Sequence, residues 1–233
     1  MSLWHKDMVE HLEHNCFHNR DGKALERKSD KYYNLIVSKY LARELTTIDN
    51  EYPISVLDFG CGTGRQLELN LIPKENYTGF DSSLDMIDKA KNKFPEHTFI
   101  SDKKDLENKC FDLVLCNDVL QHVSSIDEFK SLLKELASFG NYLVLHFWYT
   151  EEPSSKPLAT KIFNTVYPEF FISKKDLEEI LLDDSFIKYS DIELNYFDKQ
   201  KPYKCCVLEL NLLHANNVID LDFIESLEQS EKI

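Results

Sequence analysis

A glycine-rich turn between residues 56 and 65 constrains this chain more than any other stretch. It reads Val-Leu-Asp-Phe-Gly-Cys-Gly-Thr-Gly-Arg, so an apolar run meets Asp58 and glycines then occupy every second position. Glycine lacks a Cβ and adopts positive φ readily, so the backbone of this turn can approach a ligand closely. The following residues, 65–69, can begin a helix whose first N–H groups point toward the same place. The stretch predicts a strand, a tight turn and a helix arranged around a ligand.

The spacing of the glycines separates two classes of ligand-binding turn. Dinucleotide-binding folds use Gly-x-Gly-x-x-Gly, whose last glycine lets the helix pack on the strand. Counted from Gly60, that last position is Arg65, so this fingerprint fails. Counted from Asp58, the stretch reads Asp-x-Gly-x-Gly-x-Gly, which resembles motif I of the class I S-adenosylmethionine-dependent methyltransferases. A plain glycine-rich turn between a strand and a helix is the alternative interpretation.

Two later segments carry the same resemblance. A short expected strand over 77–80 ends at Asp81, where an acid can bind a nucleoside ribose through both hydroxyls. Phe-Asp-Leu-Val at 111–114, followed by Leu-Gln-His-Val at 120–123, is similar to a second hallmark of small-molecule members of this family. The resemblance spans about Tyr32 to Leu213. It implies an enzyme, a methyltransferase, with S-adenosyl-L-methionine as its cofactor.

The resemblance also implies which residues bind that cofactor. They belong to the glycine turn, to the ends of the second and third strands with the helix start after Asp81, and to the end of the fourth strand. The expected cofactor-binding residues are Asp58, Gly60, Cys61, Gly62, Gly64, Asp81, Ser82, Met86, Asp102, Lys103 and Asn117. For Asp102, a solvated loop acid is an equally good interpretation, and Asp81 could be no more than a helix-start acid.

Residues at the ends of the fourth and fifth strands are expected on the acceptor side, because the carboxyl ends of parallel strands point into the ligand crevice. We predict His146 first and His122 second as the catalytic general base, needed only if the acceptor holds a proton. His122 could equally be a histidine packed at a helix start. The aromatic-rich segment 157–171 is expected to be a substrate lid or a core-covering helix. The predicted substrate residues are Trp148, Tyr149, Phe163 and Tyr167.

The order of the expected elements predicts the fold. A helix from Ser29 or Asp30 to about Leu45 precedes five strands alternating with helices, and a helix and two strands (186–196 and 203–213) follow. This order requires a mostly parallel sheet covered on both faces. We therefore expect an α/β, Rossmann-like, doubly wound sheet of seven strands, with the last strand antiparallel and an N-terminal helical lid.

The domain organisation expected from this order is simple, since 233 residues suit one α/β domain. We expect an N-terminal helical extension over 1–30 and a methyltransferase domain over 31–214. A substrate-lid insertion is expected within that domain at 150–172, and an acidic tail over 215–233. His11 and His14 would share a face of a leading helix, but no acid–histidine pattern completes a metal site, so no metal is expected.

Charge narrows the class of acceptor. The chain carries 41 Asp and Glu against 27 Lys and Arg, a net charge of −14, which repels nucleic acid unless a local basic patch compensates. We therefore expect a small-molecule methyl acceptor, methylated on oxygen or nitrogen by in-line displacement. The alternatives are a protein or RNA acceptor, or a non-catalytic domain that binds S-adenosylmethionine.

Composition also bears on location. The chain contains no run of about 18 apolar residues, so no membrane span is expected, and its first residues lack the apolar region of a secretory signal. Six cysteines without a Cys-x-x-Cys pair are typical of reduced, intracellular usage. We expect a cytoplasmic monomer or homodimer.

Overall fold

The computed structural model describes residues 28–43, 54–69, 72–162, 165–183, 189–197 and 204–212. The helical extension predicted over 1–30 lies outside these ranges except for 28–30, and the acidic tail predicted over 215–233 lies wholly outside them. His11 and His14 are therefore outside the described residues as well.

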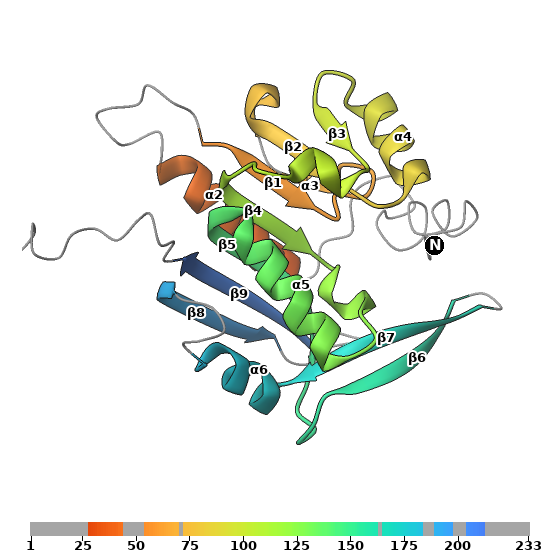
Figure 1. Cartoon of the computed structure of the whole chain (residues 1–233), viewed down its shortest axis with the longest axis vertical. Helices are drawn as coiled ribbons and strands as arrows, with labels where there is room; N and C mark the ends of the chain where they lie inside the picture. The colour runs from red at the N-terminus through yellow and green to blue at the C-terminus, as the bar shows by residue number, and fades with distance from the viewer. Residues whose placement is uncertain are drawn as a thin grey trace, which may run out of the picture.

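Seven strands of the sheet follow the predicted Rossmann-like order. Five of them run parallel, in the spatial order β3 (Thr98–Ile100), β2 (Tyr77–Phe80), β1 (Val56–Phe59), β4 (Phe111–Asn117) and β5 (Gly140–Thr150). The last strand, β9 (Lys204–Leu212), lies between β5 and β8 (Tyr189–Phe197) and is antiparallel to both. The predicted mostly parallel sheet with an antiparallel last strand is thus confirmed (Figure 1).

Two further strands make this a sheet of nine strands within the described ranges, two more than predicted. β6 (Lys156–Ile162) and β7 (Thr165–Ser173) form an antiparallel hairpin, and β7 pairs in parallel with the end of β5 at Tyr149 and Thr150. The aromatic-rich segment 157–171 is therefore a hairpin and not the core-covering helix of the alternative interpretation. Figure 1 shows this hairpin reaching beyond the rest of the sheet.

Helices cover both faces of the sheet, as doubly wound folds require. α2 (Lys28–Arg43) and α4 (Leu84–Lys93) bury apolar side chains on one face, while α5 (Ile126–Ser138) and α6 (Lys174–Leu181) do so on the other. Three helices begin at a serine whose Oγ accepts a backbone N–H from the first turn, namely Ser83, Ser125 and Ser173. The short elements are α3 (Arg65–Leu69), η2 (Lys74–Asn76), η3 (Lys103–Leu106) and η4 (Leu120–His122).

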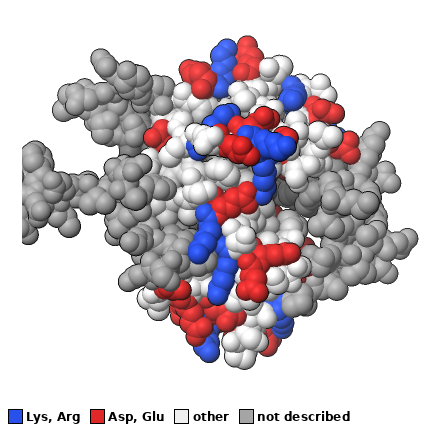
Figure 2. All heavy atoms as spheres, in the orientation of Figure 1, with Lys and Arg blue, Asp and Glu red and all other residues white. Residues whose placement is uncertain are grey.

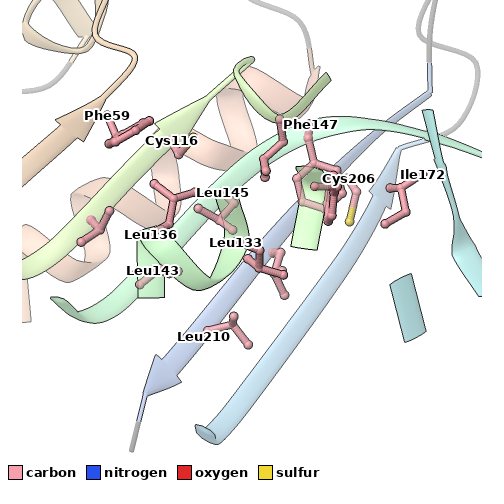
Figure 3. Close-up of a cluster of buried hydrophobic side chains, with 14 of the residues drawn as sticks. Phe59, Cys116, Leu133, Leu136, Leu143, Leu145, Phe147, Ile172, Cys206 and Leu210 are labelled. Carbon is pink, nitrogen blue, oxygen red and sulfur yellow. The ribbon is translucent and has the colours of Figure 1, made fainter. Parts of the chain in front are cut away.

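Alternation along the central strands divides the core between these two helical layers. Leu113, Leu115 and Val144 pack on the α2 side. The residues that alternate with them in the same two strands pack on the α5 side, namely Val114, Cys116, Leu143 and Leu145. Figure 3 shows part of the α5-side cluster, in which side chains of β4, β5 and β9 meet Leu133 and Leu136 of α5. The same alternation directs the next residues along, Asn117 and His146, toward the α2 side.

Hydrogen bonds among two serines and an aspartate attach the start of the hairpin to α6. The backbone N–H of Ser155 donates to Asp176 Oδ2 at 2.7 Å, and the Ser155 hydroxyl donates to the same oxygen. The N–H of Ser173, at the end of β7, donates to Ser155 Oγ at 2.8 Å. Both ends of the hairpin are therefore tied to the N-terminus of one helix.

No helix in the described ranges is long and apolar enough to cross a membrane.

Candidate active site

The glycine turn after β1 is hydrogen-bonded to the end of β2. The N–H groups of Gly60 and Cys61 both donate to the carbonyl of Phe80, at 2.7 and 2.9 Å. All three glycines have positive φ, which is +78° at Gly60, +55° at Gly62 and +84° at Gly64. The sequence requirement for glycine is therefore a backbone requirement at each of these positions.

The three glycines differ in what a side chain would meet. A Cβ at Gly60 would lie 2.2 Å from Val119 Cγ2, and one at Gly64 would lie 2.8 Å from the ring of Phe94. A Cβ at Gly62 would meet nothing within 4 Å. Gly60 and Gly64 thus permit close packing, whereas Gly62 borders open space that a ligand can fill. Open space at this position is what the predicted cofactor site needs.

Asp81 lies directly beside that open space. Its Oδ2 accepts the N–H of Gly62 at 3.0 Å, and its Oδ1 accepts the N–H of Ser83 at 2.8 Å. Burial raises the pKa of this carboxyl, and the two backbone N–H groups oppose the rise. Each carboxylate oxygen can accept more than one hydrogen bond, so both remain able to accept a ribose hydroxyl.

We expect Asp81→Ala to weaken S-adenosylmethionine binding by roughly 1.5–3 kcal/mol, or roughly 10- to 150-fold in Kd, because a charge-assisted hydrogen bond to the ribose is lost. Isothermal titration calorimetry measures this directly. Asp85→Ala is the matched control, since Asp85 is an exposed acid in the first turn of α4. Equal affinities for the Asp81→Ala and wild-type proteins would refute the ribose assignment.

Asp58 is buried beneath the same turn. Its Oδ2 accepts the hydroxyl of Tyr77 at 2.8 Å. Burial raises the pKa of Asp58 to about 7, the charge of Asp81 adds to the rise, and the Tyr77 hydrogen bond opposes it. Burial likewise raises the pKa of the Cys61 thiol. The glycine turn thus lies between two carboxyl groups, those of Asp58 and Asp81, whose pKa values are both raised above that of an exposed Asp.

The ends of β4 and β5 bring three ionisable side chains together. Asp118 follows β4 with φ of 58°, and its N–H donates to the carbonyl of His146 at 2.9 Å. Nδ1 of His146 lies 2.9 Å from Oδ1 of Asp118. Burial lowers the pKa of His122, while the charge and backbone of Asp118 act in the opposite direction. The predicted general-base candidates, His146 and His122, are therefore grouped around Asp118.

Helix α2 covers this cluster. Tyr33 is fully buried, and its ring meets that of His146 edge-on with 6.1 Å between centroids. Burial raises the pKa of Tyr33, and the charges of Asp58, Cys116 and Asp118 add to the rise. Helix α2 thus lies over the cluster at the carboxyl ends of β4 and β5, and the predicted N-terminal helical lid over the cofactor stays a prediction.

The remaining predicted cofactor residues lie at three places. Ser82 is exposed, and Ser83, not Ser82, accepts the N–H of Met86, whose side chain is buried. Oδ1 of Asp102 accepts the N–H of Lys104 at 3.0 Å, so Asp102 caps η3. These roles are local, and the proposed cofactor contacts of these residues stay predictions.

Lys103 is directed toward α5. Its Nζ lies 2.6 and 2.7 Å from the two carboxylate oxygens of Glu135, and 5.4 Å from the centroid of the Phe59 ring. This ion pair is partly exposed. It explains the orientation of the Lys103 side chain without a contact to the cofactor. Asn117, by contrast, ends β4 in register with His146, within the cluster described above.

The predicted substrate residues are divided between the two faces. Trp148 packs on Phe171 of β7 with 5.5 Å between ring centroids and stays partly exposed. Tyr149 is buried in the α5-side core, where its ring lies 4.9 Å from that of Tyr196. Tyr167 falls within β7, and Phe163 lies outside the described residues. Trp148 and Tyr149 therefore do not line the same surface.

Sequence reasoning missed Asp118. Its position directly after Asn117, at the end of a buried strand, was the available signal. Nothing in the local sequence indicates that the backbone turns into the left-handed region there, or that Asp118 meets a residue 28 positions later. Among the described residues, no group of three or more His, Cys, Asp or Glu side chains is arranged to hold a metal ion.

With this geometry in place, the comparison with known proteins defines the class. Residues 29–181 match the family described as a methyltransferase domain, and the chain belongs to that family. It is a class I S-adenosylmethionine-dependent methyltransferase, an enzyme whose cofactor is S-adenosyl-L-methionine.

Individual relatives share about a quarter of their residues with this chain. The chain is 26% identical over 202 residues to malonyl-[acyl-carrier protein] O-methyltransferase of Priestia megaterium, covering 76% of this chain and 73% of the relative. It is 27% identical over 220 residues to malonyl-[acyl-carrier protein] O-methyltransferase 2 of Ilyobacter polytropus, covering 90% and 78%.

Solved structures agree in fold. An S-adenosylmethionine-dependent methyltransferase from Clostridium acetobutylicum superposes with a TM-score of 0.56 at 18% identity, covering 79% of this chain and 92% of that one. Magnesium protoporphyrin IX methyltransferase from Synechocystis PCC 6803, with S-adenosylmethionine bound, gives 0.54 at 19% identity, covering 91% and 100%. The acceptors named for the relatives and for this structure differ, so the comparisons leave the acceptor of this chain open.

Proposed function

We propose that this methyltransferase acts on a small-molecule acceptor, at oxygen or nitrogen. The observation that carries the proposal is the cover formed by α2, which buries Tyr33 completely and places its ring on His146 at the carboxyl end of the sheet. A small acceptor can enter beneath such a cover, whereas a folded macromolecule would have to displace it. Two relatives named as malonyl-[acyl-carrier protein] O-methyltransferases favour oxygen over nitrogen, whereas the acceptor in their name is carried on a protein and does not support the small-molecule part of the proposal.

Surface charge supports the same conclusion. The net charge is −14, and Figure 2 shows Lys and Arg interspersed with Asp and Glu on the face that carries α5. Several of these basic side chains are already paired with acids, among them Lys74 with Glu96 and Lys103 with Glu135. Nucleic-acid binding needs a concentrated positive surface, so an RNA acceptor is disfavoured.

The residues divide into two groups in this proposal. Residues of the glycine turn and Asp81 hold the cofactor, which supplies a methyl group on a sulfonium and so needs little further activation. Residues at the ends of β4 and β5 align the acceptor, an effect that can reach roughly 7–11 kcal/mol of barrier. His146 and His122, the general bases predicted from the sequence, and Asn117 belong to the cluster that is proposed to face the reacting centre.

The hairpin of β6 and β7 is proposed as the substrate lid predicted over 150–172, inside a catalytic domain over 31–214. Support comes from packing, because β7 lies against η4, the short helix that carries His122. Trp148 and Phe171 stack where the hairpin leaves β5. Through these contacts, a movement of the hairpin would also shift residues at the ends of β4 and β5, where the acceptor is proposed to bind.

The cysteines fit a reducing compartment. Five of them, all free among the described residues, are Cys61, Cys110, Cys116, Cys205 and Cys206. This supports the proposal of a cytoplasmic protein, and a monomer or homodimer stays a prediction.

The experiment that tests the proposal is transfer of labelled methyl from S-adenosylmethionine into three fractions of a cell extract: small molecules, protein and RNA. We expect label in the small-molecule fraction. Label confined to protein or RNA would overturn the proposal in favour of a macromolecular acceptor. Tight cofactor binding without transfer to any fraction would favour the non-catalytic alternative.

A further inference from the structure

Asp118 directly follows β4 and has a backbone conformation that few residues adopt. Its φ of 58° lies in the left-handed region, which Asp and Asn tolerate better than other non-glycine residues. Its N–H donates to the carbonyl of His146 at 2.9 Å, which fixes this conformation against β5. Backbone outliers of this kind are concentrated at active sites and ligand clamps. The turn therefore holds the Asp118 carboxylate in one direction.

Asp118 and His146 are in contact but differ in exposure to solvent. The side chain of His146 is 0% exposed, whereas that of Asp118 is 19% exposed. His146 lies beneath Tyr33, and its Nδ1 is 2.9 Å from Asp118 Oδ1, which is the distance of a close ion pair. Of the two side chains, only that of Asp118 is accessible from outside, and His146 contacts it from the buried side.

The residue that follows Asp118 contacts the glycine turn. Val119, the residue after Asp118, packs so tightly on Gly60 that a Cβ there would lie 2.2 Å from it. Gly62, two residues further along the turn, borders the open space assigned to the cofactor. Asp118 is thus at the junction between the cofactor cradle and the carboxyl end of β5.

We propose that Asp118 receives the proton of the methyl acceptor, that His146 is the residue that positions Asp118, and that the acceptor is therefore a hydroxyl or an amine and not a carboxylate. The proposal rests on the proposed function. His146 is the base predicted from the sequence, but it is buried. The proposal therefore assigns the direct contact with the acceptor to Asp118.

The proton and electron balance is simple. A lone pair of the acceptor oxygen or nitrogen forms the bond to the methyl carbon, and the carbon–sulfur bond breaks with its electron pair on sulfur. The acceptor's proton passes to the carboxylate of Asp118. From there it can leave to water, because that side chain is partly exposed.

The surroundings of Asp118 favour a proton donor as acceptor. Charge from Asp118 reaches His122 on η4, Tyr33 on α2 and Cys116 on β4, and Asp58 on β1 acts on both Tyr33 and Cys116. Two carboxyl groups thus lie near the site, together with two histidines, a phenol and a thiol. An acceptor carboxylate would be brought against like charge, which opposes binding.

Asp118→Asn is the variant that tests the role of the charge. Asn has the same shape and tolerates positive φ, so the turn is preserved while the base is lost. We expect methyl transfer to fall by about 10²- to 10⁴-fold, with affinity for S-adenosylhomocysteine unchanged by calorimetry. Asp88→Asn, at an exposed position on α4, is the matched control. Transfer at the wild-type rate by the Asp118→Asn protein would overturn the proposal.

The positioning role of His146 has its own readouts. His146→Asn places an amide nitrogen near the position of Nδ1, so we expect it to retain more transfer than His146→Leu. Nitrogen NMR of the histidine side chains should show His146 protonated on Nδ1 in the wild type, with a changed signal in Asp118→Asn. Equal rates for the two His146 variants would contradict this role, and S-adenosylhomocysteine binding verifies that each is folded.

The acceptor class is read from the labelled product. Mild alkali releases label from methyl esters as methanol, whereas methyl ethers and methylated amines keep it. We expect small-molecule product formed from the cell extract to retain its label. Release as methanol would overturn this inference and leave the proposed function intact. Absence of label from the small-molecule fraction would overturn both.

Discussion

Gly62→Asn should weaken cofactor binding more than any other substitution that we propose, while the protein stays folded. Gly62 has φ of +55° and open space where its Cβ would lie. Asn tolerates this backbone conformation, and Asn108 already occupies it elsewhere in the chain with φ of 62°. The side chain therefore enters the cradle without disrupting the turn. We expect affinity for S-adenosylmethionine to fall at least about 100-fold by calorimetry.

Gly60→Ala is the informative contrast. Its Cβ would lie 2.2 Å from Val119 Cγ2, so the expected loss is in folding stability, by roughly 1–3 kcal/mol in denaturant unfolding. Two neighbouring glycines should thus separate binding from stability. If Gly62→Asn bound the cofactor normally, the cradle would have to be placed elsewhere.

The second large effect is expected at Asp58, where loss of a charge should stabilise the cofactor-free protein. The carboxyl is buried with a pKa of about 7, well above the value of 3.8 for an exposed Asp. The folded state therefore binds more protons than the unfolded state between these values, and this group makes stability fall as pH rises from about 4 to 7. Asp58→Asn removes that loss, because the amide stays neutral.

Denaturant unfolding at two pH values measures this effect. At pH about 8 we expect Asp58→Asn to be more stable than wild type by roughly 1–3 kcal/mol, and the difference should shrink as the pH falls and vanish only at about pH 4, near the pKa of an exposed Asp. The Tyr77 hydroxyl can still donate to the amide oxygen, so packing is retained. Lower stability of the variant at pH 8 would contradict the argument. Cofactor affinity should fall in the same variant, a trade-off that is common at functional sites.

Several features of the fold could be predicted because their causes are local. The three glycines, Asp58 beside them and Asp81 at the end of the second strand depend on residues within one turn of each other. The start of α4 after Asp81 is equally local, because Ser83 accepts the N–H of Met86. The order of strands followed from the alternation of elements and the rules for parallel crossovers.

Other features depend on contacts that are distant in sequence. Residues 157–171 combine aromatic and β-branched residues without a clear period, so the sequence left a substrate lid and a core-covering helix open, and the antiparallel pairing of β6 with β7 was not predicted. Asp118 and His146 meet because β4 and β5 align Asn117 with His146. The division of Trp148 and Tyr149 between two faces follows from strand alternation, but the face that carries the site was not evident from the sequence.

The placement of β9 has a consequence for biosynthesis. This strand is the last described segment of the chain, yet it lies in the interior of the sheet, with Val207, Leu208 and Leu210 fully buried. While the ribosome is still making it, β5 has an open apolar edge that can pair with other chains. A nascent polypeptide stalled before residue 204 should therefore be a target for chaperones, and release from them should coincide with completion of the C-terminal hairpin of β8 and β9.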